Sequence, residues 1–242
     1  MPEDILEGSP DSYFSELKNL AFERPPKVLL DCSQLHQVVS GHINILWQSR
    51  SICKEAGVPI YLTNPGGNLI RVLRILDLLE LFEFSGAINA FDEETIKTEL
   101  LNIEDTGLNL EFKCRKSEII KSRDCLRDYL KDMNLSSAII YDLETLFYEV
   151  VNNIAEHSDL NENQTIKFEA LCKDDRIVLN FFDNGRPFNP THLNFKYDPA
   201  NATFENKKRG YGLIMINRMS DKISYHREEN GLNVLTLEKR WR

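Results

Sequence analysis

The chain has 242 residues, 42% hydrophobic and 28% charged, which is typical of one or two globular domains and excludes a disordered chain, a collagen and a coiled-coil rod. Its most apolar stretch, 69–84, is interrupted by charges and falls short of the roughly 18 apolar residues that a membrane helix needs, so no membrane partner is expected. The net charge of −9 argues against a nucleic-acid partner, because phosphate binding needs a basic surface and the Lys-Lys-Arg run at 207–209 is short.

The pattern of the first part predicts a small α/β domain at residues 1–90. Two buried strands flank an amphipathic helix in one β-α-β unit, and an Asn-Pro-Gly-Gly break precedes further apolar residues at helical spacing. The expected elements are strand 27–32, helix 43–56, strand 58–63, helix 69–81 and an extended segment 82–88. The acidic segment 91–107 has no strand pattern and is expected to be a linker.

The second part, 108–242, predicts an α+β two-layer sandwich. Period-two alternation indicates antiparallel hairpins, the last turning at Asn230-Gly231, and Ser136 or Ser137 is the expected N-cap of the longer helix. The expected elements are strand 108–114, helices 117–133 and 137–157, and strands 165–172, 176–182, 222–227 and 232–239. Two domains also agree with the charge distribution, because residues 1–105 carry 8 basic and 17 acidic residues and the rest carries 21 of each.

The start of the chain and its cysteines indicate the compartment. The first ten residues are acidic and lack the basic and apolar regions of a secretory signal, so an intracellular protein is expected. The five cysteines are never spaced as Cys-x-x-Cys, which argues against a zinc knuckle or a disulfide framework. We expect reduced thiols that mostly pack in the interior.

A polar flank of the helix 137–157 is the first candidate for chemistry. Glu149, Asn153 and His157 follow each other at four-residue steps, so they share one side of the helix, opposite an apolar stripe. Such spacing alone also fits a solvated polar flank.

Two glycine motifs follow in order. The segment 183–187, Asp-Asn-Gly-Arg-Pro, comes directly after a predicted strand, and 209–213, Arg-Gly-Tyr-Gly-Leu, opens an apolar helical run to Met219. Each alone also fits an ordinary turn or a loop-to-helix junction. The three motifs in this order are unlikely to arise by chance.

With these motifs the chain resembles the GHKL ATP-binding domain, the Bergerat fold of gyrase, Hsp90, histidine kinases and MutL. Residues 149–157 (EVVNNIAEH) look like its N box, and 183–187 and 209–213 like its two glycine boxes. The DNGRPF form and the strand GLNVLTLEK are most similar to bacterial anti-sigma-factor serine kinases. The resemblance covers about 108–239 and implies ATP and Mg²⁺ as cofactors and a cytoplasmic location.

The resemblance and the residue types together assign roles around adenine and the metal. Asp183 suits the exocyclic amine of adenine, and Gly185 lets the backbone approach the ring. Asn153 offers a neutral oxygen to Mg²⁺, and Glu149 is the candidate base. His157 is expected to cap the helix end and pack beneath the site rather than bind metal.

Phosphate binding is assigned to the second glycine box. Gly210, Gly212 and Leu213 open a helix whose N-terminal amides can hold phosphates without a Walker lysine. Residues 188–208 are expected to form a lid, and Lys207, Lys208 or Arg209 can reach the γ-phosphate. The alternative for these three is a solvated basic turn.

The first domain resembles the STAS domain, the fold of anti-sigma-factor antagonists, over 27–84. The segments KVLLDCSQL, RSICKEAGVPIYLTNP and IRVLRILDLLELFEF carry the resemblance. The phosphoacceptor motif of that family is degenerate here (VVSG, 38–41), so Ser40 is a phosphoacceptor only under a gapped alignment and otherwise an N-cap or loop serine. A docking or regulatory role therefore fits better than that of a conventional substrate.

The leading functional hypothesis is an Mg·ATP-dependent serine/threonine kinase of a partner-switching pathway. Its implied partners are a STAS-domain protein, a sigma factor or both, and a homodimer is compatible with this role. The alternative is a non-catalytic switch whose nucleotide state sets its affinity for such a partner. A histidine kinase is disfavoured, because no histidine lies in a dimerising helix ahead of the ATP domain, and a chaperone-type or topoisomerase-type ATPase lacks its transducer domain here.

Overall fold

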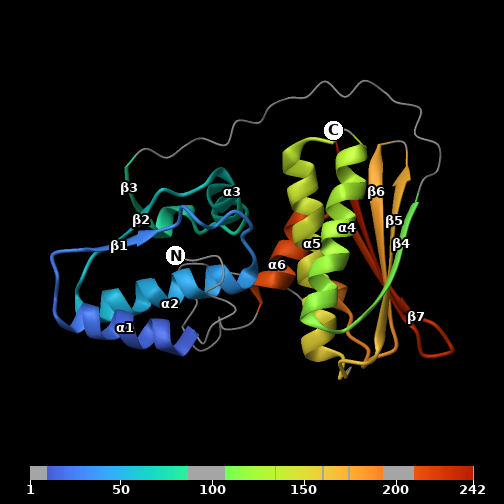
Figure 1. Cartoon of the computed structure of the whole chain (residues 1–242), viewed down its shortest axis with the longest axis horizontal. Helices are drawn as coiled ribbons and strands as arrows, with labels where there is room; N and C mark the ends of the chain where they lie inside the picture. Colours follow the sequence, from blue (N-terminus) through green and yellow to red (C-terminus); the bar gives the residue numbers. More distant parts are fainter. Residues whose placement is uncertain are drawn as a thin grey trace. The chain divides into compact units, whose positions relative to one another are not determined.

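The computed structural model describes residues 10–86, 107–133, 135–159, 161–173, 175–192 and 210–241 (Figure 1). The chain divides into two compact units. Within the described ranges, no helix combines the length and apolar character needed to cross a membrane.

The first unit contains a parallel three-stranded sheet with the order β1-β2-β3. The predicted β-α-β unit is therefore confirmed. Its elements are α1 (Pro10–Phe22), β1 (Val28–Asp31), α2 (Ser40–Ala56), β2 (Ile60–Thr63), α3 (Gly67–Ile75), a 3₁₀ turn η2 (Leu79–Leu81) and β3 (Glu83–Ser85).

The helix α1 was not expected from the sequence. Its buried face consists of Phe14, Leu17 and Ala21, and the hydroxyl of Tyr13 lies 2.9 Å from Ser49 Oγ on α2. Because Ser49 Oγ donates its own proton to a backbone carbonyl, Tyr13 is the donor. This bond and the apolar contacts hold α1 against α2.

The helix predicted at 69–81 ends earlier than expected, at Ile75. Asp77 takes a left-handed conformation with φ of 53°, and the amide of Leu78 donates to the carbonyl of Leu73. Leu76 and Leu78 are fully buried at this reversal. The residues after Ile75 are buried although they are not helical, so the apolar spacing extends past the end of α3. Periodicity alone does not distinguish such a buried turn from a longer helix.

The second unit is a five-stranded antiparallel sheet with the order β4-β5-β6-β8-β7. Figure 1 shows the helices of this unit on one side of the sheet, as the predicted two-layer α+β sandwich requires. Its elements are β4 (Gly107–Lys113), α4 (Lys116–Asp132), α5 (Ser137–His157), β5 (Thr165–Lys173), β6 (Arg176–Asp183), the 3₁₀ turn η3 (Pro190–His192), α6 (Tyr211–Met219), β7 (Lys222–Arg227) and β8 (Asn233–Arg240).

An aromatic cluster joins α5 to the sheet. The ring of Phe147 packs against those of Phe112, Phe168 and Phe181, which lie on β4, β5 and β6, with centroid distances of 4.9 to 6.1 Å. Ser136 is the N-cap of α5, because its Oγ accepts a hydrogen bond from the amide of Ile139. The predicted apolar stripe of α5 is buried, so the polar flank of the helix is fixed relative to the sheet.

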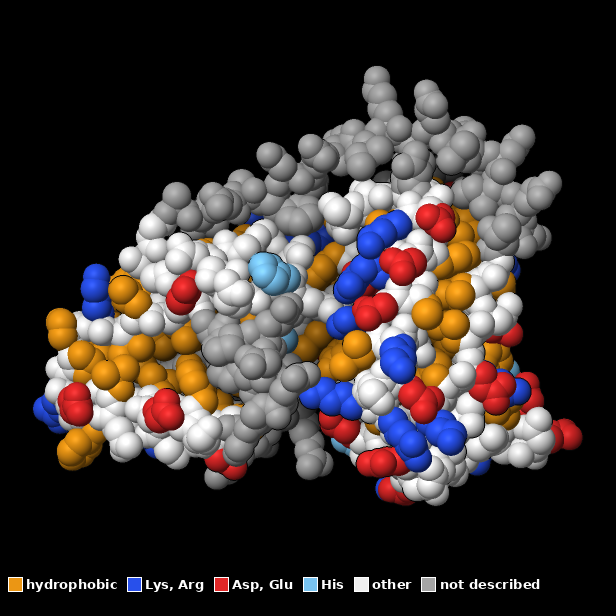
Figure 2. All heavy atoms as spheres, in the orientation of Figure 1, with side chains coloured by type: hydrophobic (Ala, Val, Ile, Leu, Met, Phe, Trp, Pro, Cys, Tyr) orange, Lys and Arg blue, Asp and Glu red, His pale blue; other side chains and the backbone are white. Residues whose placement is uncertain are grey.

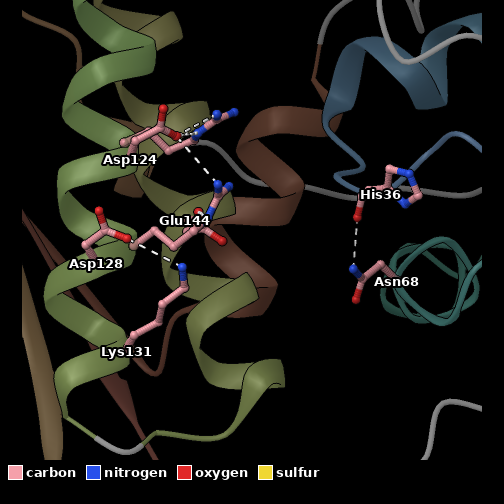
Figure 3. Close-up of polar contacts among 8 residues, drawn as sticks. His36, Asn68, Asp124, Asp128, Lys131 and Glu144 are labelled. Carbon is pink, nitrogen blue, oxygen red and sulfur yellow. Dashed lines mark hydrogen bonds and ion pairs between the residues drawn. The ribbon is translucent and has the colours of Figure 1, made fainter.

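The outer surface of α4 and α5 carries interspersed charges (Figure 2). Figure 3 shows Glu144 of α5 beside Asp124 of α4, with Asp128 paired to Lys131 one turn further along. Burial raises the pKa of Glu144, and the guanidinium of Arg127 that pairs with it opposes this shift. The ion pair between Arg127 and Glu144 joins α4 to α5.

All five cysteines are free thiols. Cys32, Cys53, Cys114 and Cys172 are buried, and burial raises the pKa of Cys32 to about 11. Cys125 on α4 is exposed. The expectation of reduced, mostly packing cysteines is confirmed.

Candidate functional site

A pocket in the second unit lies between α5, the end of β6, α6 and the β7–β8 hairpin. Two of the residues predicted to bind nucleotide, Asn153 and Asp183, line it together although they are 30 positions apart. Leu213 of α6 is a third. The described residues lining the pocket are Val150, Asn153, Ile154, Ser158, Asp183, Arg186, Phe188, Pro190, Leu213, Ile216, Tyr225, Asn233 and Leu235.

Asp183 is the last residue of β6 and is only 6% exposed. Its Oδ1 accepts hydrogen bonds from the amide of Gly185 at 2.8 Å and from Asn233 Nδ2 at 2.9 Å. No described residue bonds its Oδ2. One carboxylate oxygen is thus held by the protein, and the other is available to a donor in the pocket.

Asn153 lies on α5 with a buried side-chain nitrogen. Its Nδ2 has no hydrogen-bond partner among the described residues. A buried amide without an acceptor costs about 1–3 kcal/mol, so a ligand oxygen at this place would relieve a real penalty.

Gly185 is required by a close approach that the sequence did not reveal. A Cβ added at this position would lie 2.4 Å from Ser158 Cβ and 2.5 Å from the Ser158 carbonyl oxygen. The amide of Arg186 donates to the same carbonyl at 2.8 Å. Gly185 therefore fits the segment after β6 against the C-cap of α5, and its approach to a base ring stays a prediction.

The second glycine box is described only in part. Gly210 has a φ of 139°, a conformation that favours glycine, and α6 begins at the next residue, as predicted. Gly212 lies in the first turn of α6. Lys207, Lys208 and Arg209 lie outside the described residues, as does 193–206 of the expected lid, and the lid's first residues Phe188 and Pro190 line the pocket.

The two outer residues of the polar flank are not among the described residues that line the pocket. Glu149 is only 3% exposed and is not among the described residues that line it. The expectation that His157 packs beneath the site was wrong, because its side chain is 40% exposed and lies beside Glu156. Each four-residue step rotates about 40° around a helix, so Glu149 and His157 lie about 40° to either side of Asn153.

Three residues of the site region were missed by the sequence reading: Tyr225 and Arg227 on β7, and Asn233 on β8. Asn233 is 3% exposed and is the first residue of β8, two positions after Gly231. A buried polar residue at such a position was an available signal, although its neighbours depend on strand register. Ser40, in the first unit, is the first residue of α2 with Val39 as N-cap, and its role as phosphoacceptor stays a prediction.

Comparison with known families identifies both domains of the chain. A family model described as a histidine kinase-like ATPase domain matches residues 112–239. The chain belongs to this family. A STAS domain model matches residues 2–90, so a STAS domain precedes the ATPase domain, and the boundary residues themselves stay a prediction. No curated protein matches the chain.

The chain is also similar to parts of solved structures. The RsbU and RsbW domains of a Mycobacterium tuberculosis protein match 56% of this chain with 17% identity and a TM-score of 0.40, and this chain spans 32% of that one. The SiaB–SiaC complex from Pseudomonas aeruginosa matches 54% of this chain with 17% identity and a TM-score of 0.45, over 88% of that chain.

Proposed function

We propose that the ATPase domain binds Mg·ATP in this pocket and that the protein is a serine/threonine kinase acting on a STAS-domain partner. The observation that carries the proposal is the meeting of Asn153 and Asp183 in one pocket, each with a polar atom that no described residue satisfies. Apolar side chains such as Ile154 and Leu213 supply walls for a planar base. Asp183 Oδ2 would accept from the exocyclic amine of adenine.

The residues present also fit a magnesium ion. The amide oxygen of Asn153 is a ligand type that Mg²⁺ accepts, and Mg²⁺ in nucleotide sites takes few protein ligands because phosphates and waters supply the rest. The unpartnered Nδ2 of the same side chain can meet a phosphate oxygen. When bound, the metal would neutralise phosphate charge.

Phosphoryl transfer would need little more from the protein than positioning and a base. A partner hydroxyl would form a bond to the γ-phosphorus as the bond to the β–γ bridging oxygen breaks, releasing ADP. Glu149, one helical turn before Asn153, would accept the hydroxyl proton. A lid basic residue, Lys208 or Arg209, would contact the γ-phosphate.

A nucleotide-dependent switch for a STAS protein or sigma factor is the second candidate. It is favoured by the position of Glu149, which is buried and outside the described lining of the pocket. In such a switch, nucleotide binding at Asp183 and Asn153 would set partner affinity without phosphoryl transfer.

The nucleotide site is tested by Asp183→Asn. The variant should weaken ADP binding by roughly 10- to 100-fold, because it replaces a charged hydrogen bond to the base amine and adds a competing donor. Isothermal calorimetry with Mg·ADP on the full chain measures this, and Asp128→Asn, at an exposed position on α4, is the matched control. Unchanged ADP affinity in Asp183→Asn would contradict the assignment.

Catalysis is tested separately by Glu149→Gln. The variant should keep Mg·ADP affinity and transfer the γ-phosphate of labelled ATP to a purified STAS-domain protein about 10²–10⁴ times more slowly. A transfer rate equal to that of the wild type would remove Glu149 as base. Nucleotide binding by the wild-type chain without any transfer would leave the switch as the function.

A further inference from the structure

Three polar residues stand side by side at one end of the ATPase-domain sheet. Asp183 on β6 is directly opposite Asn233 on β8, and Asn233 is directly opposite Arg227 on β7. Residues in such register share one face of a sheet and are close enough to interact. Tyr225 lies two residues before Arg227, on the same face of β7.

The side-chain amide of Asn233 uses all of its hydrogen-bonding capacity within the protein. Its Nδ2 donates to Asp183 Oδ1 at 2.9 Å and to the carbonyl of Gly185 at 3.1 Å. Its Oδ1 accepts from Tyr225 Oη at 2.8 Å and from Arg227 Nη1 at 2.7 Å. Two donors and two acceptor sites are all that an asparagine side chain offers, so Asn233 keeps nothing for a ligand.

Arg227 decides which way this amide faces. A guanidinium has donors only, so the atom of Asn233 that meets it must be the oxygen, and the nitrogen must then face Asp183. The same Nη1 also donates to the carbonyl of Gly185 at 3.1 Å, which ties the segment after β6 to β7. A rotated amide would set Asn233 Oδ1 against Asp183 Oδ1, and two acceptors would repel.

We propose that Arg227 and Tyr225 are positioning residues that act through Asn233 to determine base selectivity. Because they fix the amide of Asn233, its Nδ2 always donates to Asp183 Oδ1. Asp183 Oδ2 then remains as a hydrogen-bond acceptor for a ligand in the pocket. A 6-amino purine offers a donor to that oxygen, whereas a 6-oxo purine offers another acceptor. This inference rests on the proposed nucleotide site and assigns its preference for adenine to residues outside the three family motifs.

The experiment compares ADP with IDP, which carries an oxygen in place of the adenine amine. Calorimetry on the full chain with Mg²⁺ should show ADP preferred by the wild type at least about 100-fold. Arg227→Met should lower this ratio by about tenfold, because a charged hydrogen bond that fixes Asn233 is lost. Lys222→Met, which removes an exposed cation from the same strand, should leave the ratio unchanged.

The ratio separates selectivity from other effects. A general electrostatic effect of the lost Arg227 charge on the nucleotide phosphates would weaken ADP and IDP equally and would therefore cancel in the ratio. Tyr225→Phe removes one hydroxyl that bonds Asn233 and should lower the ADP-to-IDP affinity ratio by roughly threefold. This variant tests the positioning role if Arg227→Met does not fold.

The outcomes distinguish the inference from the function on which it rests. If the wild type binds neither nucleotide, the proposed nucleotide site fails. If the wild type prefers ADP and both variants keep its ratio, or weaken both nucleotides equally, the positioning role is overturned. A ratio that falls in both variants and not in Lys222→Met supports it.

Discussion

Replacing Lys239 by methionine should lower the free energy of unfolding of the ATPase domain by about 3–5 kcal/mol. Lys239 Nζ lies 3.1 Å from Asp142 Oδ2, and the two side chains are only 15% and 1% exposed. The same Nζ donates to the carbonyl of Met219 at 2.8 Å, at the C-terminal end of α6. The variant removes the Lys239 cation from beside a buried carboxylate and from the C-terminal end of a helix, where a cation is favourable.

Tryptophan fluorescence during urea unfolding measures this effect in one domain. The chain has two tryptophans, Trp47 on α2 and Trp241 just after β8, so a Trp47→Phe background leaves Trp241 to report on the ATPase domain. Adding Asp142→Asn to Lys239→Met should recover part of the loss, because the buried negative charge that Lys239 faces is then removed as well. A loss below about 1 kcal/mol, the size expected for an exposed lysine pair, would show that the contact is not a buried salt bridge.

The ATPase domain was largely predictable because its sequence patterns have local causes. The stripe of α5 repeats at helical spacing, Ser136 caps it, and the strands alternate with period two, so each element follows from neighbouring residues. The STAS domain was less predictable. The buried face of α1 is short, so its helical pattern is weak in the sequence. The early end of α3 depends on the left-handed conformation of Asp77, and the apolar residues around Asp77 hide this end in the sequence pattern.

The site was predictable where one helix or one turn brings residues together. Asn153 and Asp183 were found because each lies in a local motif with its own chemistry. Asn233 and Arg227 were missed because their contact exists only through the register of β7, β8 and β6, and register is a property of the assembled sheet. The same reasoning applies to Gly185, whose close neighbour Ser158 is far away in the sequence.

Gly185→Ala is the second change with a large expected effect. Its new Cβ would meet the Ser158 carbonyl at 2.5 Å, a distance that real Cβ atoms essentially never show, so the segment after β6 or the end of α5 must move. Such overpacking typically costs about 1–3 kcal/mol. The movement would also displace the Gly185 amide and carbonyl, which bond Asp183 Oδ1 and Asn233 Nδ2.

The variant should therefore lose stability without nucleotide and also bind Mg·ADP at least about tenfold more weakly. Trp241 fluorescence in the Trp47→Phe background measures the first effect, and calorimetry measures the second. Asp128→Asn, at an exposed position on α4 of the same domain, is the control for both measurements, because an exposed ion pair contributes at most about 1 kcal/mol. Weaker ADP binding at unchanged stability would place the need for glycine at the base ring, whereas a loss of both places it at the contact with Ser158.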